Sequence, residues 1–285
     1  MTHLMARHFF PVTTGLGRDY APRIYEFLFP GWAAEKCPMP YANLQTPRGD
    51  AVTVFWPLTA VVIFAGLVTC WLLGMQLLVR ALRQGAQARR GIFIWSSALL
   101  SYGFMCLGGF FFHCFHIRPI FHMMDVASTG LASLSIIAGF AAFVGLVDDR
   151  TTTQRLAWVA SAVGFVVVDL YSPSFVQEQL YALPAFGAAG AGAAFLLRSL
   201  GAVQKGAEQA AGLREAQLWL LLAGFGVVVG AAALPLDKYL CLYLGAEFSF
   251  LFWFFLGCNS AMFAVHRFAL VVADKNLQFT DVKRQ

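Results

Sequence analysis

Charged residues are scarce in this sequence, where Asp, Glu, Lys and Arg make up 12% of 285 residues. Soluble globular domains carry about 25% charged and about 45–50% apolar residues. This chain is 59% apolar, and its mean hydropathy is +0.67. The composition excludes an ordinary soluble domain. The formal net charge of +5 does not indicate nucleic-acid binding, because no basic stripe alternates with exposed aromatic residues, and Lys and Arg at membrane edges explain the excess.

Several catalytic and binding motifs are also missing from the sequence. It contains no GxSxG nucleophile motif, P-loop, dinucleotide-binding glycine motif or EF-hand loop, which argues against the corresponding enzyme and binding classes. The six cysteines form no CxxC pair, and we expect the four in apolar segments to be small core residues. Cys37 and Cys241 are predicted to face the same side, so a disulfide between them is one option if that side is an oxidising compartment, and two free thiols are the other. A secretory signal peptide is not expected, because the first long apolar stretch begins near residue 51.

Long apolar segments dominate what is present. Runs of 18 or more apolar residues recur, and each is long enough to cross a bilayer core of about 30 Å. The segments are continuously apolar rather than alternating, which favours helices over a transmembrane β-barrel. We therefore predict an all-α polytopic membrane protein, a seven-transmembrane helix bundle. The seven predicted spans are 51–79, 91–115, 120–147, 156–173, 177–197, 216–235 and 243–273.

The spans divide the chain into an extramembrane N-terminal arm (1–50), a transmembrane domain (51–273) and a C-terminal tail (274–285). The side that holds the tail carries twelve Lys and Arg residues, and the opposite side carries seven. The positive-inside rule therefore predicts an N-terminus outside and a C-terminus on the cytoplasmic or matrix side. Residues 1–18 contain no acid, a composition similar to that of organelle-targeting segments and equally compatible with an ordinary ordered tail. In the first case, the mitochondrial inner membrane is the suggested location. Small residues in the fifth and sixth spans predict close helix packing within the bundle or, alternatively, dimerisation.

Two ionisable residues near the second and third spans are candidate functional groups. His113 ends the run Gly108-Gly-Phe-Phe-Phe-His113, and Asp125 follows twelve residues later in the next apolar segment. Placing an Asp at the centre of a membrane helix costs roughly 2.5–3.5 kcal/mol on insertion scales, so such groups are functional candidates by default. Asp169 is a further acid at membrane depth. A proton transporter would need acids at several depths, whereas most acids here lie near one interface.

The residues around His113 resemble a known family. Phe112-His113-Cys114-Phe115, Arg118 and Asp125-Val126 are similar to the second and third spans of the alkaline ceramidase-like (CREST) superfamily, with one residue inserted. The segment Cys37-Pro-Met-Pro-Tyr-Ala-Asn-Leu-Gln-Thr-Pro47 resembles the Cys- and Pro-containing segment before the first span of that family. The resemblance implies seven spans with the N-terminus outside. It also implies a zinc ion held by the His113 position and by an HxxxH pair on the seventh helix, with a Ser and an Asp orienting the zinc-bound water.

This chain departs from that pattern at the positions that would complete the zinc site. Gly109 occupies the position of the Ser, and alignment on Trp253 places Phe250 and Phe254 at the two seventh-helix His positions. Phenyl rings cannot coordinate zinc. His266 lies twelve residues beyond Phe254, about 18 Å further along a helix axis, and we predict an interfacial role for it. His113 and Asp125 are then relics of a catalytic site.

An alternative metal site remains open in the turn between the second and third spans. His113 and His116, and likewise His122 and Asp125, are spaced i, i+3 and can each share a helix face. The competing prediction is that these side chains hydrogen-bond each other, Arg118 or loop carbonyls, which would satisfy an otherwise costly Asp.

The sequence thus predicts a non-catalytic ceramidase-like membrane protein, or pseudoenzyme. We expect it to act as a structural accessory subunit of a membrane complex, for which an organellar respiratory complex is the suggested setting, and to contact bilayer lipids. No cofactor and no nucleic-acid partner is expected. The alternative is an active zinc-dependent amide or lipid hydrolase with a rearranged metal site. A ligand-gated receptor is a third class, for which the sequence contains no evidence in either direction.

Overall fold

The structure is a computed structural model, and it describes residues 38–45, 47, 49–117, 120–172, 174–204, 210–275 and 277. Seven of its helices are long and apolar enough to cross a membrane. This confirms an all-α polytopic membrane protein. The long helices are α3 (Pro57–Gln84), α4 (Ile92–Gly109), α5 (Ile120–Phe143), α6 (Thr152–Tyr171), α7 (Ser174–Gln204), α8 (Ala210–Leu244) and α9 (Phe250–Asp274). The short elements are β1 (Tyr41–Gln45), β2 (Ala51–Phe55), η2 (Gly85–Gln87), η3 (Phe110–Cys114) and η4 (Ala246–Phe248).

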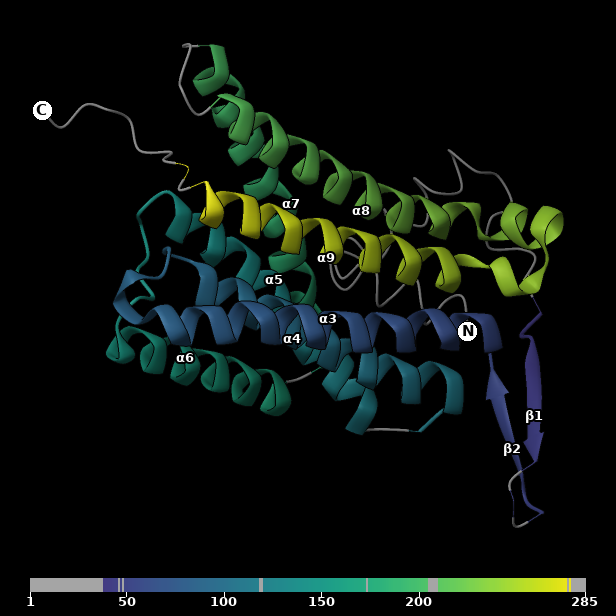
Figure 1. The fold of residues 1–285 in the computed structure, drawn as a ribbon. Helices are drawn as coiled ribbons and strands as arrows, with labels where there is room; N and C mark the ends of the chain where they lie inside the picture. Colours follow the sequence, from purple (N-terminus) through teal and green to yellow (C-terminus); the bar gives the residue numbers. More distant parts are fainter. Residues whose placement is uncertain are drawn as a thin grey trace, which may run out of the picture.

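The chain before the first helix forms a β-hairpin, which corrects the predicted start of the first span at residue 51. Strands β1 and β2 pair antiparallel, with Tyr41 opposite Phe55, and the hairpin lies at the end of the bundle where α3 begins (Figure 1). Helix α3 starts only at Pro57, since proline is favoured at the first helical position, where its missing N–H costs nothing. The predicted boundary between arm and transmembrane domain therefore falls inside the hairpin.

The last two spans also differ from their predicted bounds of 216–235 and 243–273. Helix α8 continues to Leu244, and α9 begins only at Phe250. Gly245, with φ of 97°, makes the break in a backbone conformation that glycine adopts without steric cost. The polar residues near 237 were expected to end a helix, yet the helix contains them. The Asp237 carboxylate instead accepts a hydrogen bond from the first N–H group of the neighbouring helix α9.

The bundle is organised around α3, α4, α5 and α9. Helix α8 packs along α9 and α7 packs against α5, while α6 lies at the periphery of the bundle (Figure 1). Four helices meet in an aromatic cluster with ring centroids 5.1–5.9 Å apart. Offset and edge-to-face pairs at such distances add to the stability gained from burial. The cluster consists of Trp95 on α4, Phe140 on α5, Phe195 on α7 and Phe268 on α9.

Glycines on α8 and α9 let their backbones touch. A Cβ built on Gly226 would lie 2.5 Å from the carbonyl oxygen of Gly257, and one built on Gly257 would lie 2.4 Å from that of Gly226. Either contact is impossible, so both positions require glycine for this approach. The prediction of packing within the bundle is confirmed for the sixth span. On α7, by contrast, a Cβ at Gly190 would meet nothing within 4 Å.

Candidate functional site

His113 lies in an irregular segment at the end of α4. Residues Phe110–Cys114 form a π-helical turn, a rare geometry that often marks functional sites. Two residues further, His116 has a φ of 56°, which is uncommon for a residue with a side chain. The segment around His113 thus contains a π-helical turn and one of the two described non-glycine residues with a positive φ.

The structure brings His113 and Asp125 together. The His113 Nε2 lies 3.6 Å from the Asp125 Oδ2, and both side chains are largely buried. This distance is within ion-pair range but too long for a hydrogen bond. Gly108 makes the approach of α4 and α5 possible, because a Cβ there would lie 2.6 Å from the Asp125 backbone nitrogen. The sequence prediction of a His113–Asp125 pair therefore has a geometric counterpart.

A phenyl ring from α9 lies beside this pair. The ring of Phe255, which is fully buried, has its centroid 5.9 Å from that of His113 at an interplanar angle of 69°. A Cβ on Gly109 would lie 3.2 Å from Phe255 Cζ and 3.6 Å from His113 Cδ2. Position 109 thus faces both rings. The arrangement offers an imidazole, a carboxylate and a hydrocarbon wall.

The two predicted positions on the seventh span, Phe250 and Phe254, lie next to each other on α9, and the neighbouring ring of Phe255 lies beside His113. Phe250 and Phe254 pack on each other with ring centroids 5.5 Å apart, and the ring of Phe254 lies beside Gly230 of α8. The α9 ring in contact with His113 is Phe255. The predicted register depended on the single Trp253 in a run of aromatic residues, and such a run contains nothing else that fixes the helix phase.

The other predicted ligands lie in separate surroundings. The ring of His116 stacks on Phe55 of β2, with centroids 4.2 Å apart and planes 7° from parallel. The ring of His122 lies 4.7 Å from that of Phe112. Among the residues that the structure describes, no group of three or more His, Cys, Asp and Glu side chains is placed to hold a metal ion. Arg118, the predicted hydrogen-bond partner, lies outside the described residues.

His266 is inside the protein rather than at the membrane interface, which corrects its predicted role. Its side chain is buried, and Nε2 lies 3.0 Å from Oε1 of Gln76 on α3. The next residue, Arg267, points elsewhere and places its guanidinium 5.4 Å from the ring centroid of Trp219. Neighbouring residues on a helix face different directions, so the charge of Arg267 was a poor guide to the position of His266.

A polar contact that the sequence analysis missed lies one helical turn beyond Phe255. The Asn259 Oδ1 accepts a hydrogen bond of 2.8 Å from the Tyr102 hydroxyl, and Nδ2 donates to the Val62 carbonyl at 2.8 Å. These bonds connect α9 to α4 and α3. Gly66 makes room for the amide, because a Cβ there would lie 2.2 Å from Oδ1. A lone Asn within an apolar helix was the available signal.

Three acidic residues serve as acceptors for the first N–H groups of other helices. Glu247 Oε2 accepts from the Leu58 N–H of α3 at 3.2 Å, and Asp237 accepts from the Phe250 N–H of α9 at 2.5 Å. Asp149 accepts from Gly91 at 2.7 Å and from Ile94, at the start of α4, at 3.1 Å. The first N–H groups of a helix lack partners within the helix, and a negative charge there is further stabilised by the helix dipole. These acids therefore join helices.

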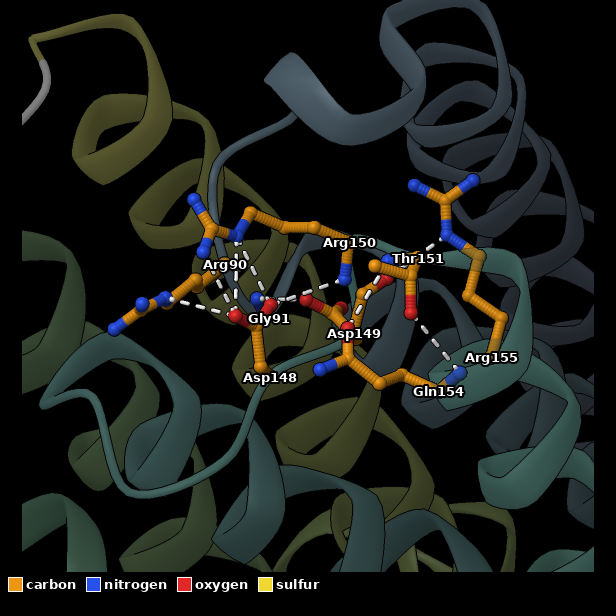
Figure 2. A network of polar contacts seen from close by, with 8 residues as sticks. All are labelled: Arg90, Gly91, Asp148, Asp149, Arg150, Thr151, Gln154 and Arg155. Atoms are coloured by element: carbon orange, nitrogen blue, oxygen red, sulfur yellow. Dashed lines mark hydrogen bonds and ion pairs between the residues drawn. The ribbon is translucent and has the colours of Figure 1, made fainter.

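Asp149 belongs to a larger polar network (Figure 2), which lies where α4 and α6 begin, at the end of the bundle opposite the start of α3. It is 2% exposed, and this burial raises the pKa of its carboxyl, against the lowering effect of the backbone N–H groups of Gly91 and Ile94. Its neighbour Asp148 is more exposed, and hydrogen bonds from the Arg150 side chain lower its pKa. Arg155 donates from Nε to the Asp149 carbonyl at 2.8 Å and from Nη2 to the Gly85 carbonyl at 2.9 Å. The network connects the loop between α3 and α4 to the loop between α5 and α6.

The described cysteines fall into two groups, one disulfide-bonded and four free. Cys241 is disulfide-bonded, and its predicted partner, Cys37, lies outside the described residues. The four cysteines of the apolar segments are free, with Cys70, Cys106 and Cys114 buried and Cys258 partly exposed.

Comparisons with known proteins add no relative. No protein-family model, no curated protein and no solved structure matches this chain. The chemistry of the site must therefore be argued from its own residues. The pair of His113 and Asp125 can exchange a proton or supply two metal ligands. The neighbouring side chain of α9, Phe255, has no atom that can bind a metal.

Proposed function

We propose that this chain is a non-catalytic, ceramidase-like integral membrane protein, in which His113 and Asp125 persist as a structural pair. The observation that carries the proposal is the ring of Phe255 against His113. A catalytic zinc site needs three protein ligands and one open position. His113 and Asp125 supply two candidate donors, and the α9 residue that faces them supplies none. No cofactor is then required for the fold or the function.

Metal analysis of the purified protein tests the non-catalytic part of the proposal. We expect far less than one zinc per chain after purification in metal-replete buffer, and no difference between wild type and His113→Ala. A stoichiometric zinc that disappears in His113→Ala would contradict the proposal. Gln76→Ala, which removes the partner of the buried His266, serves as a control for general perturbation of a buried His contact.

The proposed role is that of an accessory subunit in a membrane complex that also contacts lipid. Support comes from the periphery of the bundle. Only 11% of the residues in the most apolar 18-residue stretch of α6 are buried within the chain, and the same holds for Leu183–Leu200 of α7. On α7 the open position of Gly190 adds a surface that a second helix can approach closely. Co-purification after gentle extraction tests this role. The proposal predicts that the chain migrates with other membrane proteins, and migration as an isolated monomer would contradict it.

For the location, we propose the mitochondrial inner membrane, with the hairpin end outside and the Arg-rich end on the matrix side. The acid-free composition of residues 1–18 and the excess of Lys and Arg at one end support this orientation. The disulfide of Cys241 lies near the hairpin end, since the following Glu247 contacts the start of α3. Disulfides persist in oxidising compartments, so the bond fits an outward-facing end. A respiratory complex is the proposed setting, and it is tested by finding the chain in such a complex on native gels of mitochondrial membranes.

The irregular backbone around His113 favours a second function. The π-helical turn at Phe110–Cys114 and the positive φ of His116 are features that cluster at active sites. They support the alternative of a zinc-dependent amide or lipid hydrolase. An assay of ceramide hydrolysis separates the two functions, because the hydrolase alternative requires zinc-dependent turnover that His113→Ala abolishes, and the non-catalytic proposal requires no turnover in either protein.

A further inference from the structure

Two arginine side chains share one carboxylate where α4 and α6 begin. The Arg150 Nη2 lies 2.8 Å from Asp148 Oδ2, and the Arg150 Nε lies 3.0 Å from Oδ1. The Arg90 Nε lies 3.3 Å from the same Oδ2. Figure 2 shows both guanidinium groups flanking Asp148 on the same side of the network. Two positive charges therefore lie within a few ångströms of each other, with one negative charge between them.

The two guanidinium groups keep donors available. Arg90 makes its contact through Nε alone, and Arg150 uses Nε and Nη2. The remaining terminal nitrogens make no hydrogen bond to any residue that the structure describes, and the side chains are 40% and 38% exposed. The pair thus presents unused N–H groups to its surroundings. The region has a net positive charge, because its four arginines outnumber its two acids: Arg89, Arg90, Arg150 and Arg155 against Asp148 and Asp149.

The frame that holds the pair is rigid. Asp149, between Asp148 and Arg150 in the chain, is buried and fixed to the start of α4 by its bonds to Gly91 and Ile94. Arg155 ties the same loop to the Gly85 carbonyl. Because the backbone on both sides of Arg150 is fixed, a ligand would bind to side chains that are already placed, and little ordering entropy is lost on binding.

The pair lies just before the start of two candidate membrane spans, where we expect the lipid headgroups to be. Arg90 precedes the span Ile92–Cys114 by two residues, and Arg150 precedes the span Thr152–Tyr171 by two residues. The positive ends of both helix dipoles are therefore directed towards this region. Leu146, in the same loop as Arg150, is 80% exposed and offers an apolar contact beside the charges. The arginines would contact the anionic headgroup of a lipid, and Leu146 would contact its acyl chain.

We propose that Arg90 and Arg150 form a binding site for the phosphate of an anionic phospholipid at this end of the bundle. Guanidinium groups recognise phosphate through paired N–H···O bonds, and basic sites between transmembrane helices on the cytoplasmic or matrix side bind such headgroups. A phosphodiester carries one negative charge, which would offset part of the net positive charge of this region. The site is independent of whether His113 binds a metal.

The test measures lipid retained by the full chain in nanodiscs of phosphatidylcholine mixed with phosphatidylglycerol, read out by native mass spectrometry. Wild type is expected to retain phosphatidylglycerol in preference to phosphatidylcholine. The double variant Arg90→Gln/Arg150→Gln should lose this preference by about tenfold or more, since it removes both positive charges and their charge-assisted hydrogen bonds. Arg83→Gln, which removes an exposed charge from the last turn of α3, is the matched control and should retain the preference.

A conservative variant keeps the test valid if the double Gln variant does not fold. Arg90→Lys/Arg150→Lys preserves both charges but removes the planar donor pairs, and we expect a several-fold loss of preference. An unchanged preference in a folded Gln or Lys double variant would overturn the site. Inorganic phosphate added to nanodiscs of phosphatidylcholine alone distinguishes the source of the phosphate: binding to wild type there, with no preference for phosphatidylglycerol, would overturn the lipid assignment.

Discussion

At the scale of single residues, the scarce acids of this chain are used as links between helices. A carboxylate near the membrane is costly unless its charge is satisfied. Glu247, Asp237 and Asp149 meet this requirement by accepting from the first N–H groups of α3, α9 and α4. Each bond satisfies an N–H that the helix itself leaves open. Acids that interrupt the apolar pattern in the sequence therefore help to hold the bundle together.

Asp149 gives the clearest prediction at this scale. Asp149→Ala removes the acceptor for two N–H groups and should destabilise the protein by about 1–2 kcal/mol, the upper range for loss of a helix cap. Asp149→Asn keeps one side-chain oxygen and avoids the ionisation that burial opposes, so it should cost less. Denaturation in detergent, followed by loss of helical circular dichroism, measures both changes. Asp148→Asn alters the more exposed neighbour and should have a smaller effect than Asp149→Ala; an equal or larger effect would count against the capping role.

Asn259 supports a second prediction. Asn259→Leu leaves the Tyr102 hydroxyl and the Val62 carbonyl without their partner on α9. Interhelical hydrogen bonds in membranes contribute about 0.6 kcal/mol on average and about 1.7 kcal/mol at most, and we expect a loss of stability in this range. Ser260→Ala is the matched control, because Ser260 is exposed and bonds only to its own helix, at the Leu256 carbonyl. The interpretation fails if the two variants unfold alike.

The sequence predicted which residue types lie near His113, but it did not predict which side of α9 faces them. The proximity of His113 and Asp125 followed from a motif. The contact of Phe255 with His113 did not, because α9 begins with a run of aromatic residues in which any phase is apolar. The burial of His266 against Gln76 was missed for a related reason, since the charge of Arg267 next to it suggested an interface.

At the scale of elements, the close approach of α8 and α9 depends on the absence of side chains at Gly226 and Gly257. Gly226→Ala would drive a methyl group into the Gly257 carbonyl, which lies 2.5 Å from the built Cβ. Overpacking of this kind costs typically about 1–3 kcal/mol, and the same unfolding assay should detect it. Gly224 lies two residues before Gly226 on the same helix, and a Cβ built on it would have nothing within 4 Å. Gly224→Ala should therefore be neutral or slightly stabilising. Equal effects of the two substitutions would argue against the contact.

The existence of the seven spans could be predicted from the sequence, because long apolar runs bounded by charge leave few alternatives in a membrane protein. The ends of the spans could not. Residues 51–55 are apolar enough to extend the first span, yet they pair with β1, and pairing with a strand elsewhere in the chain is not visible in a hydropathy pattern. Helix α8 likewise continues past Asp237, because that carboxylate finds its partner on α9 rather than in water.

At the scale of the whole molecule, the two ends of the bundle differ in chemistry. The hairpin end carries the disulfide of Cys241 and the stacked pair of Phe55 and His116. The opposite end carries ion pairs between helix termini, with Arg80 Nη2 2.6 Å from Asp274 and Lys275 Nζ 2.5 Å from Glu215. The guanidinium of Arg89 also donates to the Leu277 carbonyl there. Such an asymmetry is expected of a protein with one fixed orientation.

Orientation can be tested with cysteines introduced at the two ends. Asp50, beside the exposed turn of the hairpin, and Leu146, in the loop after α5, are both exposed, so a thiol at either position should react readily. In sealed membranes with the outer face exposed, a membrane-impermeant maleimide should label Asp50→Cys at once and Leu146→Cys only after permeabilisation. The wild-type chain supplies the background, because three of the four free cysteines among the described residues are buried and Cys258 is only partly exposed. The reverse labelling would refute the orientation and would move the proposed phosphate site, which lies beside Leu146, to the outer leaflet.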